Sequence, residues 1–184
     1  MRVISGSAKG RNLQPAPGDS TRPITDKVKE AVFNILGGDI VEAVFLDLFG
    51  GTGGVGIEAL SRGAARAVFV EKNRRALATI KANLIQTRLL ERGDIVRGDA
   101  FTYLAGAPEA FHYIYIAPPQ YHRLWIAALR LIDAQPAWLA DDGEIIAQLH
   151  PKEFEDVPLL NFEVIDQRLY GSTRLVFYEH KNEG

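Results

Sequence analysis

Apolar residues along the chain alternate between short continuous runs and longer stretches with helical spacing. The short runs, each predicted to be a buried strand, cover residues 43–49, 67–70, 95–97, 112–116 and 143–148. The predicted helices between them cover residues 54–62, 73–90 and 122–134. In the helix over 73–90, the residues predicted to face inward are Leu77, Ile80, Leu84 and Ile85. Buried strands without strict alternation, joined by helices, indicate an α/β fold with a parallel sheet covered on both faces.

The two ends of the chain depart from this pattern. Residues 2–5 and 11–14 are short extended segments on either side of a turn rich in small residues, which predicts a hairpin. A proline-rich loop follows, and then a helix that begins after Thr25 and ends at Gly37-Gly38. Near the other end, residues 162–169 and 173–178 flank a turn too short for a crossover helix, so this pair is predicted to be an antiparallel hairpin.

Length and composition indicate an ordinary globular protein. With 184 residues, 47% of them hydrophobic and 24% charged, the chain suits one domain over residues 1–184. No apolar run approaches the roughly 18 residues of a membrane span, and the first residues do not begin a signal-peptide pattern. We therefore expect a cytoplasmic protein without a membrane partner. Cysteine is absent and the four histidines lack metal-ligand spacing, so we expect neither a disulfide framework nor a metal site.

Charge is distributed unevenly along the chain. The net charge of −2 alone argues against a nucleic-acid partner. Residues 1–29, however, hold six basic and two acidic side chains, whereas the remainder holds 15 basic and 21 acidic. A basic N-terminal arm on an acidic body is the first indication of a nucleic-acid partner.

The strongest local motif is glycine-rich and spans Asp47 to Gly56, between a predicted strand and a predicted helix. Glycines there let a ligand approach the backbone, and a helix N-terminus offers unpaired N–H groups. Gly51, Gly53 and Gly56 match the dinucleotide fingerprint, and Glu71 lies at the end of the next strand, where a ribose-binding acid is expected. The motif alone leaves NAD and other adenosine cofactors open.

Two features favour an amino-acid cofactor such as S-adenosylmethionine (SAM). Asp47 lies directly before the glycines, where a carboxylate can receive an ammonium group but would repel a pyrophosphate. Residues 117–121, Ala-Pro-Pro-Gln-Tyr, follow a buried strand and offer carbonyl groups and an aromatic ring but few N–H donors. Such a loop suits recognition of an amino group stacked on Tyr121.

Taken together, these segments resemble the bacterial RsmD family of small-subunit (16S) rRNA guanine-N2 methyltransferases. The segments that carry the resemblance are residues 2–13, 21–26, 31–36, 47–56, 60–64 and 70–72. The resemblance covers nearly the whole chain. It implies the class I SAM-dependent methyltransferase fold, Rossmann-like, with a seven-stranded mostly parallel sheet whose last strand is antiparallel. We expect an N-terminal hairpin and loop extension over residues 1–22, a catalytic core over residues 38–184, and a monomer.

The resemblance also implies roles for individual residues. Residues implied to bind SAM are Asp47, Gly50, Gly51, Thr52, Gly53, Glu71, Lys72, Asp99 and Ala100. Within this set, Asp47 and the glycines would hold the methionine part and Glu71 the ribose hydroxyls. Asp99 would accept from the adenine amino group, with Ala100 supplying a backbone N–H.

The catalytic loop departs from the family's usual Asp-Pro-Pro followed by an aromatic residue. Ala117 stands in place of the acid, and Gln120 is inserted before Tyr121. The N2 lone pair of guanine is delocalised, so methyl transfer needs acceptors that hold the amino hydrogens. We expect the catalytic set to be Ala117, Pro118, Pro119, Gln120 and Tyr121, with the Pro118 carbonyl and the Gln120 side chain as acceptors and Tyr121 stacked on the base.

The basic arm then has a predicted role in holding rRNA, within the 30S subunit. Lys9, Arg11 and Arg22 would contact phosphates. Arg22 and Thr25 are also candidates for the SAM carboxylate. Two alternatives stay open: a non-catalytic rRNA-binding assembly factor that retains a SAM site, and an NAD-dependent enzyme.

Overall fold

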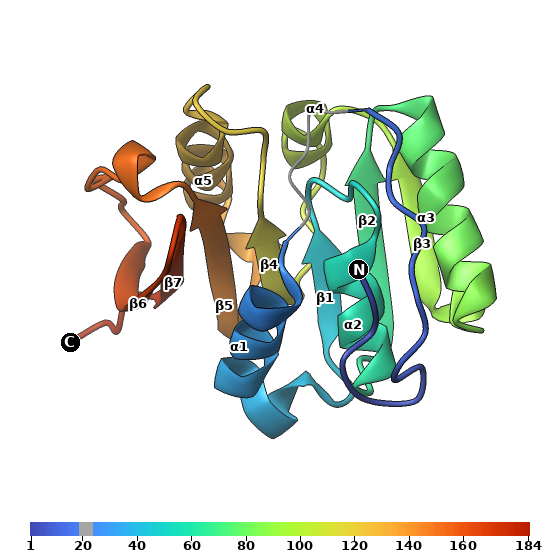
Figure 1. The fold of residues 1–184 in the computed structure, drawn as a ribbon. Coiled ribbons are helices and arrows are strands. Elements are labelled where there is room, and N and C mark those ends of the chain that lie inside the picture. Colours follow the sequence, from blue (N-terminus) through green and yellow to red (C-terminus); the bar gives the residue numbers. More distant parts are fainter. Residues whose placement is uncertain (19–23) are drawn as a thin grey trace. The chain divides into compact units, whose positions relative to one another are not determined.

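The structure is a computed structural model that describes residues 1–18 and 24–184. It divides into two compact units, Met1–Asp99 and Ala100–Gly184, each described here by itself. Among the described residues there are seven strands, which belong to a seven-stranded sheet (Figure 1).

The first unit contains three parallel strands in the order β3-β2-β1, together with the helices that connect them. Its elements are α1 (Asp26–Leu36), the 3-10 turn η1 (Gly37–Ile40), β1 (Val44–Asp47), α2 (Gly54–Ser61), β2 (Arg66–Glu71), α3 (Arg74–Gln86), η2 (Leu90–Arg92) and β3 (Gly93–Arg97). The parallel pairing confirms the alternation of strands and helices predicted from the apolar pattern.

The second unit contains four strands in the order β4-β5-β7-β6. Its elements are α4 (Ala100–Leu104), β4 (Phe111–Ile116), α5 (Leu124–Ala134), η3 (Pro136–Trp138), β5 (Leu139–Leu149), η4 (Pro151–Glu153), β6 (Phe162–Tyr170) and β7 (Thr173–His180). Strands β4 and β5 are parallel, whereas β7 runs antiparallel to both β5 and β6. The terminal antiparallel hairpin is therefore confirmed, with Tyr170 paired to Thr173 across its turn.

Helix α1 begins where its capping residue predicts. The Thr25 hydroxyl accepts a hydrogen bond from the Val28 amide at 3.3 Å, and Asp26 lies in the first turn, where its charge favours the helix dipole. Val28, Val32 and Leu36 are buried, and Gly37 ends the helix at φ +59°.

The helix predicted over residues 73–90 is shorter than expected. It ends at Gln86, because Arg88 adopts φ +60° and the Thr87 hydroxyl bonds back to the carbonyl of Asn83. The inward assignment of Ile85 is wrong, since 54% of that side chain is exposed. The buried face consists of Ala76, Thr79, Ile80, Asn83 and Leu84, so two polar side chains occupy inward positions that apolar spacing does not reveal.

The predicted N-terminal hairpin is present but irregular. It has one antiparallel bridge, between Arg2 and Asn12, and the Val3 amide donates to the Arg11 carbonyl at 2.9 Å. Other backbone groups of the two segments bond to side chains of α2 and α3 instead, so the segments are not regular strands. No helix among the described residues has the length and apolar character needed to cross a membrane.

Candidate functional site: a glycine loop, an N-terminal arm and a proline loop

Asp47 organises the loop over residues 47–56, which we call the glycine loop. It ends β1 and is 2% exposed, and its Oδ2 accepts a hydrogen bond from the Gly56 amide at 3.2 Å. Gly56 is the third residue of α2, and the residue before that helix, Gly53, has no side chain to cap it. Asp47 therefore serves as the cap from outside the helix, with its charge at the positive end of the dipole.

Burial raises the pKa of Asp47 well above its usual range, and the nearby carboxylate of Glu71 raises it further. The hydrogen bond from Gly56 opposes this shift without cancelling it. Such a carboxylate is stabilised in its charged form when a cation joins it. The chemistry suits an ammonium group at this place and disfavours a phosphate.

The backbone amides of the glycine loop are already largely paired. Gly50 donates to the Val70 carbonyl at 2.9 Å, Gly53 to the Gly50 carbonyl at 2.8 Å, and Gly54 to the Thr52 hydroxyl at 3.1 Å. The expectation of unpaired N–H groups in this loop is therefore wrong for these amides, since β2 and the loop itself supply their acceptors. A pyrophosphate would find few donors here, which disfavours the NAD alternative.

Glycine is required in this loop for its conformation and packing. Gly53 adopts φ +80°, a conformation that glycine reaches without strain. A Cβ atom on Gly56 would lie 2.3 Å from the Phe69 ring of β2, so this glycine lets α2 pack closely against the sheet. The dinucleotide-like spacing thus has a structural cause that does not depend on the ligand.

Glu71 ends β2 and holds the other side of the loop. Its Oε2 accepts from the Gly51 amide at 2.9 Å and its Oε1 from the Asn73 amide at 2.9 Å. A carboxylate has about four acceptor positions, so two remain for hydroxyl groups of a ligand. Lys72, the next residue, is exposed.

Asp99 and Ala100 follow β3, the next strand along the chain. Asp99 is half-buried, and Ala100 is the first residue of α4. The amide of a first helical residue has no acceptor within its own helix, so Ala100 can donate to a ligand. Both residues lie on the carboxyl side of β3, and their role in binding adenine stays a prediction.

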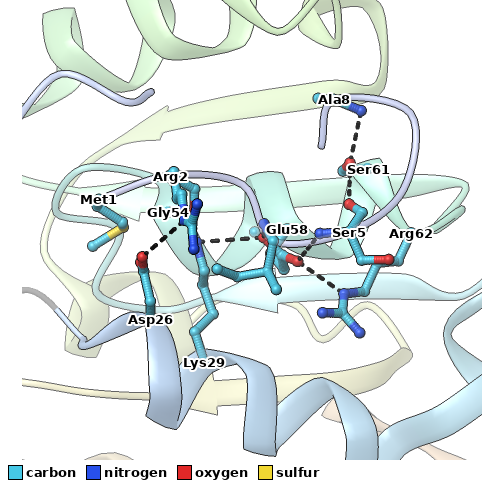
Figure 2. A network of polar contacts seen from close by, with 12 residues as sticks. Met1, Arg2, Ser5, Ala8, Asp26, Lys29, Gly54, Glu58, Ser61 and Arg62 are labelled. Carbon is cyan, nitrogen blue, oxygen red and sulfur yellow. Dashed lines mark hydrogen bonds and ion pairs between the residues drawn. The ribbon is translucent and has the colours of Figure 1, made fainter. Parts of the chain in front are cut away.

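The N-terminal arm, residues 1–14, is fastened to α2 by one buried carboxylate (Figure 2). Glu58 is fully buried and accepts from the amides of Ile4 at 3.0 Å and Ser5 at 3.1 Å. It also pairs with Lys29 of α1 at 3.3 Å and with Arg62 at 2.9 Å. Lys29 itself is fully buried and donates to the Arg2 carbonyl, so its charge is not available to RNA.

Ser61, one turn after Glu58, continues the attachment. Its hydroxyl donates to the Ser5 carbonyl at 2.6 Å and accepts from the Ala8 amide at 2.9 Å. Gly6 adopts φ +88° at this contact, and a Cβ atom there would lie 1.8 Å from the Ser61 carbonyl oxygen. The arm therefore lies directly on the α2 backbone.

The predicted RNA-contacting residues have different surroundings. Lys9 is exposed, whereas the Arg11 guanidinium donates to the Gln86 carbonyl near the end of α3. Thr25 caps α1, and Arg22 lies outside the described residues. Among the described candidates, Lys9 is the cationic residue that is exposed, whereas Arg11 is half-buried.

The proline loop, residues 117–121, follows β4 in the second unit. Gln120 is half-buried, and Tyr121 is 64% exposed and adopts φ +68°. Positive φ in an aromatic residue is strained and is typical of functional loops. The Tyr121 amide donates to Glu153, and its ring lies 5.7 Å from that of His150, so η4 holds the strained conformation.

Several residues that hold the site together are not predicted from the sequence. Glu58, Asn83, His150 and Glu153 carry contacts that join distant parts of the chain, and no local motif marks them. His122, the neighbour of Tyr121 in the sequence, is exposed, and His150 is the histidine that contacts the Tyr121 ring. Within residues 1–18 and 24–184, no cluster of acidic and histidine side chains could hold a metal ion.

The fold is that of the SAM-dependent methyltransferases. A solved structure of "Putative methyltransferase yhhF" from Escherichia coli matches with a TM-score of 0.87 and 30% identity, over 100% of this chain and 99% of that one. A further solved methyltransferase structure, in complex with S-adenosylhomocysteine (SAH), shares the fold with a TM-score of 0.66 at 18% identity, over 83% of this chain and 48% of that one. The predicted fold class is confirmed.

Sequence comparison then identifies the family. The model described as "Conserved hypothetical protein 95" matches residues 1–179, and the chain belongs to this family, the RsmD family. "Putative rRNA methyltransferase YlbH" of Bacillus subtilis is 40% identical over 98% of this chain and 100% of its own length. "Ribosomal RNA small subunit methyltransferase D" of Escherichia coli is 29% identical over 100% of this chain and 92% of its own length. Methyltransferase activity on rRNA, with SAM as cofactor, follows for this family.

Proposed function

We propose that this protein transfers the methyl group of SAM to the exocyclic N2 of a guanine in 16S rRNA, within the 30S subunit. The observation that carries the proposal is the glycine loop. It begins with a buried carboxylate suited to a cation, its amides are largely bonded within the protein, and a second carboxylate with spare acceptors lies on its other side. This combination fits an ammonium-bearing nucleoside better than a dinucleotide.

The residues assigned to SAM fit it in distinct ways. Asp47 would hold the ammonium group, Glu71 the ribose hydroxyls, and Asp99 the adenine amino group. The amide of Ala100, the next residue along the chain, would donate to the adenine ring. Gly50, Gly51, Thr52 and Gly53 shape the wall of this site, and Lys72 borders it. Bound SAM would supply an electrophilic methyl group on its sulfonium.

The proline loop would hold the guanine. Two consecutive prolines remove N–H donors, so the loop presents acceptors to the amino hydrogens. We assign the Pro118 carbonyl and the Gln120 carboxamide oxygen to this task, with Ala117 contributing only its carbonyl and Pro119 fixing the backbone. No general base is required, because the methylated amine becomes acidic enough to lose its proton to water. Tyr121, exposed and fixed by Glu153, would stack on the base, which must leave its own stack to be methylated.

The arm would bind the surrounding RNA. Lys9 is exposed and suited to a phosphate, Arg11 has further N–H donors beside the one bonded to the Gln86 carbonyl, and Arg22 and Thr25 complete the proposed set. The monomeric state is part of the same proposal.

A transfer assay with labelled SAM and unmethylated small subunits tests the activity. Incorporation of label is expected, and Gln120→Ala is expected to lower its rate without changing SAM affinity. Tight SAM binding without transfer would favour the assembly-factor alternative. Calorimetry with SAM and NAD separates the remaining alternative, and binding of NAD alone would contradict the proposal.

A further inference from the structure

Asn83 of α3 joins the N-terminal arm to the glycine loop. Its side chain is fully buried, and its carboxamide uses both donors and its acceptor. Oδ1 accepts from the Gln14 amide at 2.7 Å, while Nδ2 donates to the Gln14 carbonyl at 3.1 Å and to the Thr52 carbonyl at 2.9 Å. One side chain thus bonds the end of the arm and the middle of the glycine loop.

The start of the arm contacts the same loop from another direction. The Met1 sulfur lies 3.9 Å from the Thr52 hydroxyl, and a Cβ atom on Gly54 would lie 2.2 Å from that sulfur. Figure 2 shows Met1 and Gly54 together beside the attachment of the arm to α2. Both ends of the arm therefore meet the segment to which we assign SAM.

We propose that Asn83 is a positioning residue through which SAM and RNA strengthen each other's binding. This inference rests on the proposed function, since it takes the glycine loop as the SAM site and the arm as an RNA contact. With the bridge intact, a ligand that orders either segment also orders the other. The second ligand then finds its segment already placed, which gives positive coupling without any contact between the ligands.

Only an amide of this length meets the geometric demand at this position. Aspartate would keep the acceptor for the Gln14 amide but would turn an acceptor toward two carbonyls. Alanine would leave the Gln14 amide and carbonyl and the Thr52 carbonyl without their partner. The side chain therefore determines whether the arm and the loop move together or separately.

The test measures coupling rather than affinity. Binding of unmethylated small subunits is measured with and without saturating SAH, and binding of SAH with and without the subunits. Wild type should show the same enhancement in both directions, at least about fivefold, because binding linkage is reciprocal. In Asn83→Ala, the increase in affinity for one ligand that the other ligand causes should fall to about onefold, even if the affinity for each ligand alone changes little.

Gln86→Ala is the matched control. Gln86 lies one turn further along α3, and its side-chain amide donates to the Asn12 carbonyl of the arm at 2.6 Å rather than to the glycine loop. Its replacement loosens the arm but should retain the enhancement. A general loss of stability would affect both Asn83→Ala and Gln86→Ala. It would not abolish, in Asn83→Ala alone, the ratio between the affinities measured with and without the second ligand.

Should Asn83→Ala fail to fold, hydrogen exchange on the wild-type protein gives the answer. SAH should slow exchange of the Gln14 amide at least about fivefold, since that amide donates to Asn83. The inference is overturned if SAH leaves the exchange rate of the Gln14 amide unchanged. It is also overturned if both ligands bind to wild type but neither raises the affinity for the other. Either result leaves the proposed function standing. Failure of SAH or the subunits to bind at all would instead contradict the proposed function.

Discussion

The glycine loop and the proline loop are constructed in opposite ways. Carboxylates, a buried amide and its own carbonyls fix the glycine loop, and most of its residues are buried. The proline loop exposes its aromatic ring, adopts a strained backbone at Tyr121 and is held chiefly through Glu153. Under the proposed function, the segment assigned to SAM is held by contacts within the protein, whereas the segment assigned to the guanine presents an exposed ring on a strained backbone.

Breaking the attachment of the arm should have the largest effect. Glu58→Ala leaves the ammonium of Lys29 buried without its partner, together with two amides of the arm. The free energy of unfolding should fall by about 3–5 kcal/mol, as measured by denaturant titration. The double variant Glu58→Ala/Lys29→Met should recover much of this loss, and a single-variant loss below about 1 kcal/mol would show that the buried pair is unimportant.

Asp47→Asn separates stability from cofactor binding. The amide can still accept from Gly56 but carries no charge to bury, so the variant should melt at a higher temperature than wild type. Its SAM affinity should fall roughly 10–100-fold, the value of a charge-assisted hydrogen bond. Calorimetry of SAM binding and thermal melting measure the two effects.

The pH dependence gives the control for that variant. Because the folded-state pKa of Asp47 is raised, wild type loses stability as the pH rises from about 4, where free carboxyls titrate, through the raised pKa. The advantage of Asp47→Asn should therefore grow with pH and vanish in acid. Wild-type affinity for SAM should rise over the same interval. An advantage that is constant with pH would show that the charge of Asp47 is not its cause.

Tyr121→Gly tests the proline loop, the second of the two loops compared above. Glycine relieves the positive φ, so the free energy of unfolding should rise by about 1 kcal/mol. Loss of the stacking ring should weaken binding of the substrate RNA by about 1–3 kcal/mol. Tyr121→Phe, which keeps the ring, is the control and should leave both properties near those of wild type.

Sequence alone could predict the features that depend on local pattern. Thr25 caps α1 because the preference of threonine for that position is local, and the hairpin of β6 and β7 follows from a turn too short for a helix. Glu58 and Asn83, by contrast, read as ordinary polar positions of helices. Their partners lie 54 and 69 residues away, so only the folded chain shows that these side chains are buried and bonded.

The charge of the arm was the least reliable guide. Of the six basic residues in the segment 1–29, Lys29 is buried against Glu58, Arg2 pairs with Asp26, and Arg11 bonds a carbonyl. Net charge counts these side chains as free, because it cannot show which of them have partners. Much of the basic excess therefore fastens the arm to the body.

Charge reversal on the arm should give the smallest effect. Lys9→Glu should weaken binding of small subunits several-fold and reduce its dependence on salt, with SAM affinity unchanged. The same reversal at Lys81, an exposed residue of α3, is the matched control and should have a lesser effect. Equal weakening by both would remove the specific role assigned to Lys9.

Mass mapping of nucleosides tests the central claim most directly. Small subunits from a strain lacking the gene are incubated with the protein and SAM, and their 16S rRNA is digested and analysed. The account predicts one new N2-methylguanosine at a single position and none with Gln120→Ala/Tyr121→Ala at the same enzyme concentration and time. Methylation of a different atom or base, or no methylation despite SAM binding, would contradict it.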